Sequence, residues 1–418
     1  MTPPRHNLRV DGSRLWATIH ETAAFGGTPA GGINRLTLSR EDGAVRDWFR
    51  DACLAAGLEV GTDALGTQFA LRPGRDGARP PIAFGSHLDT QPTGGRFDGV
   101  LGVLAGLEVM RSLNDAGIET EAPLLLVNWT NEEGSRFAPA MMASAAHAGE
   151  FTTADILSRR DAAGISVAEA LAEIGYAGEE PVGARAIGAF VELHIEQGPI
   201  LEAEALTIGV VEGGQGIAWF DGTLTGFESH AGTTPMNRRR DALLGLAELA
   251  LAAERIALAH APSAVITIGE AVIAAPSRNV VPGTVRFTID LRDPQAATLD
   301  AAEAELRAAL GEIAGRRRLE AELTRIWRKA PVPFDPRLVD AVETAAGALG
   351  HPHRRIISGA GHDACNLAGI APAAMIFVPC RDGISHNETE SATPEDCTAG
   401  ADVLLHTVLA LANGPKSE

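Results

Sequence analysis

The 418-residue sequence has few cysteines, no long apolar run and little positive charge. Its four cysteines lack CxxC spacing, which argues against a disulfide framework and against a thiolate metal site. No apolar run approaches the roughly 18 residues that a membrane-spanning helix needs. The formal net charge of -19 argues against nucleic acid or an anionic membrane surface as a partner.

The first residues, MTPPRHNLRVDG, also lack the basic and then apolar pattern of a secretion signal, so we expect a cytoplasmic protein. The chain is 45% hydrophobic and 21% charged, which is an ordinary globular composition. At roughly 150 residues per domain, its length predicts two or three domains.

Residues 1–211 alternate strand and helix patterns. The strand IAFGSHL, a helix over residues 99–116 and the strand LLLVNWT follow one another, which predicts an α/β domain with a mixed, parallel-rich sheet. The glycines around Asp98 do not form the GxGxxG fingerprint, and an acidic side chain stands where a phosphate would approach. A dinucleotide site is therefore excluded.

Residues 212–329 read as strand, helix, strand, strand, helix and strand. This order predicts an inserted α+β domain with the split βαβ, ferredoxin-like motif. The proline-rich segment APVPFDPR marks the return to the first domain, which is then discontinuous over residues 1–211 and 330–418. The insert can act as a lid.

Side chains of metal-binding type follow two of the predicted strands. His87 and Asp98 come after the first, and the pair Glu132 and Glu133 comes after the second. Ligand sites of open α/β sheets lie outside the carboxyl ends of the strands, so one shared site is expected. Two further histidines complete the candidate set: His194 in VELHIEQGP and His386 in GISHNETES.

Three imidazoles and two carboxylates suit zinc, with manganese or cobalt as alternatives. Two ions about 3.5 to 4 Å apart need a bridging carboxylate, and Asp98 is the candidate because its neighbouring glycines leave room. One of Glu132 and Glu133 can bind metal while the other acts as general base. Asp89 has the spacing to accept a hydrogen bond from the His87 imidazole.

Simpler interpretations compete with this one. A lone histidine is usually structural, and paired glutamates usually lie on a solvated face. The motif GSHLDT followed by DG, and the eight-residue apolar run before the glutamates, favour the metal site. His362 in GAGHDA is glycine-flanked, which predicts an exposed residue with a supporting role.

Eight motifs together resemble the M20 family of metal-dependent amidohydrolases and occur in the order of that family. They are GSHLDT, RFDG, NEEGSRF, HIEQGP, SHAGTTPM, SRNVVPG, SGAGHDA and GISHN. The resemblance covers nearly the whole chain. It is closest to the hydantoinase/carbamoylase branch, which includes N-carbamoyl-L-amino acid hydrolases, β-ureidopropionases and allantoate amidohydrolases.

The resemblance implies two divalent metal ions per chain. His87, Asp98 and His194 match the ligands of one ion, and Asp98, Glu133 and His386 match those of the other, with Asp98 bridging. Glu132 matches the general acid/base.

The resemblance also implies roles for residues of the insert. His230 matches a histidine that stabilises the tetrahedral oxyanion, and Asn279 and Arg292 match residues that hold the substrate carboxylate. Gln215 is assigned to the same substrate-binding group. The competing interpretation of Arg292 is a surface ion pair with Asp290 or Asp293.

Family members pair through their lid domains, so we expect a homodimer in which His230 and Asn279 reach the active site of one subunit or the other. The apolar helix near residues 241–260 also favours pairing, although packing on its own sheet would explain it too. The segment NETES after His386 departs from many relatives, which have a proline and a bulkier residue. It is expected at the pocket rim, where it affects the choice of substrate.

The expected reaction is hydrolysis of the ureido C–N bond of N-carbamoyl-L-amino acids or N-carbamoyl-β-alanine. A metal-bridging hydroxide attacks, and the products are an amino acid, ammonia and carbon dioxide. Allantoate amidohydrolase is the runner-up, and an M20 dipeptidase or aminopeptidase follows. A non-catalytic binding protein is disfavoured because all five metal-ligand positions and Glu132 are present.

Overall fold

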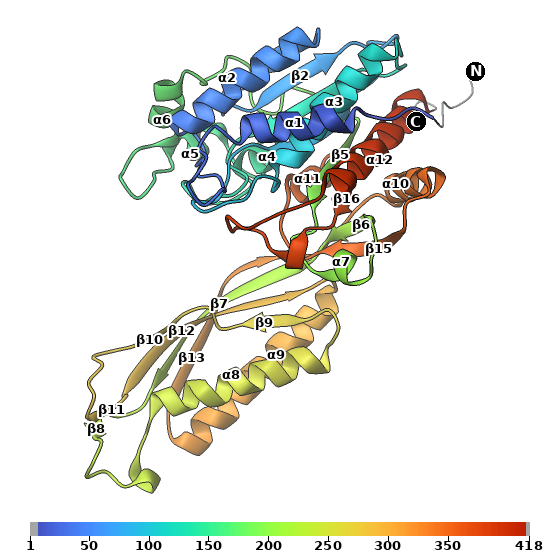
Figure 1. The fold of residues 1–418 in the computed structure, drawn as a ribbon. Helices are drawn as coiled ribbons and strands as arrows, with labels where there is room; N and C mark the ends of the chain where they lie inside the picture. Colours follow the sequence, from blue (N-terminus) through green and yellow to red (C-terminus); the bar gives the residue numbers. More distant parts are fainter. Residues whose placement is uncertain (1–6, 415–418) are drawn as a thin grey trace. The chain divides into compact units, whose positions relative to one another are not determined.

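A computed structural model describes residues 7–414, which fall into two compact units (Figure 1). Within this range, one unit comprises residues 7–213 and 333–414, and the other comprises Gly214–Val332. Among the described residues, none of the helices combines the length and the apolar character that crossing a membrane requires.

The first unit contains a nine-stranded sheet with the order β1-β2-β4-β3-β5-β16-β6-β14, and β15 pairs with β6. Its four central neighbours, β4, β3, β5 and β16, run parallel. The predicted mixed, parallel-rich sheet is therefore confirmed. The strands are β1 (Glu59–Thr62), β2 (Gln68–Arg72), β3 (Ile82–His87), β4 (Leu124–Trp129), β5 (Ala189–Ile195), β6 (Ile208–Gly214), β14 (Val332–Pro333), β15 (His353–Ser358) and β16 (Ala373–Val378).

Every residue of the four central strands is buried. Strands covered on both faces have this nearly continuous apolar character. Helix α3 (Val100–Asp115) connects β3 to β4 and packs on both strands, which explains why the order strand, helix, strand gave a parallel pair. Helix α12 (Pro394–Asn413) packs on α3, β5 and β16.

The helix predicted over residues 99–116 is present as α3. Short helices between β4 and β5 were not predicted, because each offers fewer than three turns of periodic pattern. The remaining helices of this unit are α1 (Gly12–Thr22), α2 (Arg40–Ala55), α4 (Met142–His147), α5 (Thr153–Ser158), α6 (Val167–Ile174), α7 (Ile200–Ala203), α10 (Pro336–Leu349) and α11 (Asp363–Leu367).

The second unit is an antiparallel sheet with two long helices, as the split βαβ pattern predicts. The strand order is β10-β12-β7-β13, and β9 pairs with β12. Alternate residues of β7 and β12 are buried, and they share one hydrophobic core with residues of both helices. The elements are β7 (Gly216–Thr225), α8 (Ala242–Ala259), β9 (Val265–Thr267), β10 (Ala271–Ile273), β12 (Thr284–Asp293), α9 (Ala296–Arg317) and β13 (Glu320–Lys329).

Two details of this unit differ from the sequence prediction. The second strand of the predicted order falls on the segment AVITIGEAVI and is divided into β9 and β10, because the register against β12 shifts by one residue between them. A two-stranded ribbon, β8 (Ser229–His230) with β11 (Val280–Val281), was not predicted. Its strands are two residues long, which is too short for an alternating pattern to be recognised.

Gly102 lets α3 approach the sheet closely. A Cβ added there would lie 2.3 Å from the Leu193 carbonyl oxygen, whereas a Cβ on Gly311 in α9 meets nothing within 4 Å. We expect Gly102→Ala to destabilise its unit by about 1 to 3 kcal/mol through overpacking. Gly311→Ala should instead stabilise by up to about 1 kcal/mol through helix propensity. Thermal unfolding of both variants checks this, and a Gly102→Ala midpoint at or above the wild-type value would contradict it.

Candidate metal centre

The candidate ligands lie at the carboxyl ends of the four central parallel strands. His87 is the last residue of β3, and His194 is the penultimate residue of β5. Glu133 and His386 lie in the loops after β4 and β16, and Asp98 lies just before α3. Because neighbouring parallel strands end at the same edge, residues up to about 300 positions apart meet there.

One group of potential ligands contains His87, Asp98 and His194, all of them buried. The Oδ1 atom of Asp98 lies 3.7 Å from His87 Nε2 and 3.2 Å from His194 Nε2. The three ligand atoms lie within 4.8 Å of one another, which is close enough to surround a single ion.

A second group contains Asp98, Glu133 and His386. His386 Nε2 lies 3.5 Å from Asp98 Oδ2 and 3.4 Å from Glu133 Oε2. The two oxygens of Asp98 thus face different groups, which is the arrangement that a bridging carboxylate requires. The His386 side chain is 50% exposed, so this group is the one nearer to solvent.

The chemistry of these donors fits divalent metal ions. His87 Nδ1 lies 2.9 Å from the carbonyl oxygen of Asp89, while His87 Nε2 is buried without a hydrogen-bond partner. Burial lowers the pKa of His87 to about 4, which favours the neutral imidazole that a metal needs. His194 Nδ1 likewise lies 2.9 Å from the carbonyl oxygen of Ile195, which aims its Nε2 at Asp98.

The carboxyl groups carry a large mutual repulsion. Burial, followed by the charges of neighbouring carboxylates, raises the pKa values of Glu132 and Glu133 well above their ordinary range. Against the effect of burial, His194 and the other histidines hold the pKa of Asp98 below its ordinary value. Cations in this site would relieve the repulsion and favour the ionised carboxylates.

Glu132 lies beside the first group, with its Oε2 atom 3.4 Å from His87 Nε2. The chain turns sharply at Asn131, whose φ of 61° is left-handed, so that Glu132 and Glu133 both reach the site. A buried carboxyl group with a raised pKa at this position has the properties of a general acid/base.

The contact predicted between Asp89 and His87 is present, and the atom that makes it is the backbone carbonyl oxygen of Asp89. The backbone carbonyl of Asp89 bonds to the imidazole, whereas its carboxylate lies 3.9 Å from Nδ1. The carboxylate instead accepts the backbone N–H groups of Glu132 and Glu133 at 3.3 and 3.4 Å. Asp89 therefore positions both strand-end segments, and its carboxylate is not the partner of His87.

Several buried polar residues around the site were not predicted there. His362, expected to be exposed, is 2% exposed and its ring centre lies 4.6 Å from that of His194. Gln197 Nε2 donates to Asp98 Oδ2 at 2.7 Å. Glu390, in the NETES segment expected at the pocket rim, is 5% exposed. In the sequence, the one indication that Glu390 lies near the site is that it follows the candidate ligand His386 by four residues.

The other predicted residues belong to the second unit. The β8–β11 ribbon pairs His230 with Val280, and the Asn279 carbonyl accepts the N–H of Ala231 at 2.9 Å, so these two motifs lie together. His230 Nδ1 accepts the N–H groups of Gly232 and Thr233 at 3.0 and 3.2 Å, which leaves the proton on Nε2. That tautomer can donate a hydrogen bond to an oxyanion.

Arg292 lies on β12 with its guanidinium 2.8 Å from the Asp290 carboxylate. This ion pair is the simpler interpretation considered for Arg292, and it also holds the guanidinium in a fixed orientation. Gln215 lies between β6 and β7.

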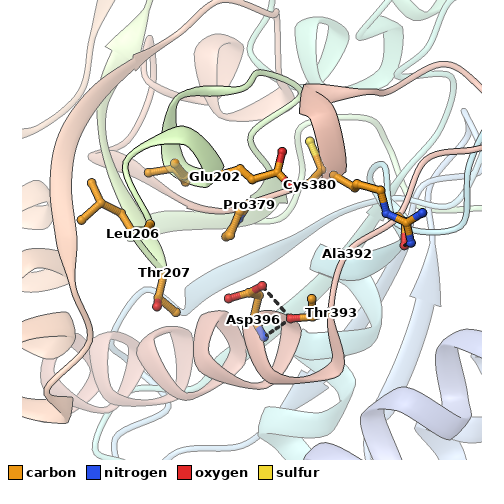
Figure 2. Close-up of a pocket in the computed structure, with 12 residues that line it drawn as sticks. Glu202, Leu206, Thr207, Pro379, Cys380, Ala392, Thr393 and Asp396 are labelled. Atoms are coloured by element: carbon orange, nitrogen blue, oxygen red, sulfur yellow. Dashed lines mark hydrogen bonds between the residues drawn. The ribbon is translucent and has the colours of Figure 1, made fainter.

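A separate cavity of about 340 Å³ lies beside the segments at residues 379–381 and 391–393, which come before and after the loop that carries His386 (Figure 2). Its lining includes Glu202, Leu206, Cys380, Thr393 and Asp396. None of the predicted site residues lines this cavity. This cavity is therefore separate from the two candidate ligand groups.

Comparisons with known proteins show the family to which the chain belongs. Residues 83–410 match the family described as "Peptidase family M20/M25/M40". The chain is 48% identical to an N-carbamoyl-L-amino-acid amidohydrolase of Rhizobium meliloti, over 98% of each chain. It is 33% identical to a ureidoglycolate hydrolase of Arabidopsis thaliana, over 97% of this chain and 87% of that protein.

Among solved structures, a hydantoinase/carbamoylase family amidase from Burkholderia multivorans superposes with a TM-score of 0.95 and is 54% identical. The match covers 98% of this chain and 99% of the other. Family match, relatives and fold agree over almost the full length. The chain is a hydrolase that belongs to the peptidase family M20/M25/M40.

Proposed function

We propose that the protein hydrolyses the ureido C–N bond of N-carbamoyl-L-amino acids and releases an amino acid, ammonia and carbon dioxide. The observation that carries this proposal is the pair of ligand groups that share Asp98, with Glu132 beside them. The 48% identity to an N-carbamoyl-L-amino-acid amidohydrolase supports the choice of substrate.

A ureido carbonyl is a poor electrophile, because two nitrogen atoms donate electrons into it. The two ligand groups would hold divalent metals, which would polarise that carbonyl and lower the pKa of water. Glu132 takes the proton of the attacking water and delivers it to the leaving nitrogen. The raised pKa of Glu132 suits this exchange, since the carboxyl group must both accept and release a proton.

Further features of the proposal rest on the family resemblance and on the ligand types. Zinc is the proposed metal, with manganese and cobalt as alternatives, because the set mixes imidazoles and carboxylates. A cytoplasmic homodimer that pairs through the second unit is also proposed. The roles of Gln215, His230, Asn279 and Arg292 in binding the substrate stay predictions.

A second candidate is the hydrolysis of a ureido compound of purine breakdown, such as allantoate. The 33% identity to a ureidoglycolate hydrolase favours a reaction of this type, at a lower level of similarity. Ammonia release from N-carbamoyl-L-amino acids, N-carbamoyl-β-alanine, allantoate and dipeptides separates the candidates. Activity on allantoate alone would replace the main proposal, and activity on dipeptides alone would indicate a peptidase.

Asp98→Ala should remove the ligand that both groups share. We expect metal analysis of the purified variant to fall below one ion per chain, whereas the wild type loaded with zinc should hold two. The reason is that each group keeps only two of its three side chains. Two ions per chain in the variant would exclude a bridging role for Asp98.

Glu132→Gln should preserve both metals and lower kcat by about 10²-fold or more, because the amide cannot carry the proton. Glu133→Gln is the matched control, since it alters the neighbouring residue and should reduce metal content instead. Metal analysis and steady-state kinetics on the same preparations distinguish the two roles. Unchanged turnover in Glu132→Gln would refute its assignment as general base.

Arg292→Ala should raise KM for N-carbamoyl amino acids by about 10-fold or more, because a charge-assisted contact to the substrate carboxylate is lost. Arg286→Ala serves as the control, because Arg286 is another arginine on the same face of β12. The same kinetics are measured with a carboxamide analogue of the substrate, which lacks the carboxylate that Arg292 is predicted to contact. The carboxylate assignment fails if both variants bind the substrate equally well.

A further inference from the structure

Glu390 is a buried carboxylate that joins two loops far apart in the sequence. Its Oε1 atom accepts the backbone N–H groups of Phe97 and Asp98 at 2.9 and 3.1 Å. Its Oε2 atom accepts the hydroxyl of Ser385 at 3.1 Å. One side chain thus binds the main chain at Asp98 and the residue immediately before His386.

Ser385 continues this connection to the metal centre. Its hydroxyl, which carries a single proton, lies between Glu390 Oε2 and Asp98 Oδ2, the oxygen that faces the second ligand group. Glu390 therefore reaches Asp98 by two routes, one through the backbone and one through Ser385. Both routes constrain the position of Asp98 relative to His386.

The surrounding backbone is shaped to admit Glu390. A Cβ on Gly95 would lie 2.1 Å from the Glu390 carboxyl carbon, so only glycine permits this approach. His386 has a left-handed φ of 55°, which a non-glycine residue adopts only when neighbouring contacts hold it. The bonds to Glu390 supply such contacts on the segment that carries His386.

We propose that Glu390 is a positioning residue that sets the distance between Asp98 and His386, and thereby the affinity of the second metal group. This inference rests on the proposed metal centre. It also predicts an asymmetry: His87 and His194 are fixed by the strands β3 and β5, so the first group depends less on Glu390. Residues that orient ligands typically change metal affinity by about 10- to 100-fold when they are replaced.

The test is zinc titration of the metal-free protein by calorimetry, without substrate. Glu390→Leu keeps most of the side-chain volume but removes both acceptors, and it should weaken the weaker of the two zinc affinities by about 10- to 100-fold. Glu390→Gln should bind zinc nearly as the wild type does, because its carbonyl accepts both N–H groups and its amide can donate to Ser385.

Glu388→Leu is the matched control, since Glu388 lies in the same loop and contacts Thr28 instead of the Asp98 segment. It should retain both zinc affinities. If Glu390→Leu does not fold by circular dichroism, Ser385→Ala removes the route through the hydroxyl and keeps the backbone contacts, so it should weaken the same zinc affinity by a smaller factor.

Two results would overturn the inference. One is that Glu390→Leu, or Ser385→Ala in its place, binds zinc with the affinities of the wild type. The other is that Glu390→Gln and Glu390→Leu lose zinc affinity to the same extent. Failure of the proposed function looks different. In that case the wild type binds two zinc ions but releases no ammonia from any carbamoyl compound, and the effect of Glu390 on zinc affinity is unchanged.

Discussion

The whole centre depends on the crowding of carboxylates around Asp98. A single buried aspartate presents one oxygen to each of two ligand groups, and two more glutamates lie within the same site. Buried like charges are strongly unfavourable unless cations or hydrogen-bond donors balance them. The raised pKa values of Glu132 and Glu133 express that cost, and the histidines that lower the pKa of Asp98 offset only part of it.

The loops that carry these groups are held by other carboxylates. Asp89 binds the consecutive N–H groups of Glu132 and Glu133, and Glu390 binds those of Phe97 and Asp98. In both cases a buried carboxylate accepts hydrogen bonds from two consecutive backbone N–H groups, and at least one of these belongs to a residue of the candidate site. The same residue type thus supplies the ligands, the proposed proton carrier and the supports that fix the loops.

Much of the fold and of the ligand set could be predicted from the sequence. Long periodic segments such as α3 and α12 and fully apolar strands such as β3 carry strong local patterns. Motifs at strand ends then indicate the site, because topology brings parallel strand ends together.

The supports could not be predicted, because they depend on three-dimensional approach between distant segments. Nothing local marks Glu390 as the partner of Phe97, and His362 looked exposed because its glycine neighbours suggested a surface loop. The prediction for Asp89 named the correct residue but no atom, since spacing alone does not determine whether a carbonyl or a carboxylate faces the imidazole.

The position of β16 in the sheet has a consequence for how the chain is made. β5 pairs with β3 on one edge and with β16 on the other, yet about 180 residues separate β5 from β16 in the sequence. At ~5 to 20 residues per second, a ribosome needs roughly 10 to 35 s to synthesise that interval. During this time the apolar edge of β5 has no native neighbour and can pair with another nascent chain. Production of the protein should therefore be more sensitive to chaperone supply and growth temperature than its finished stability suggests.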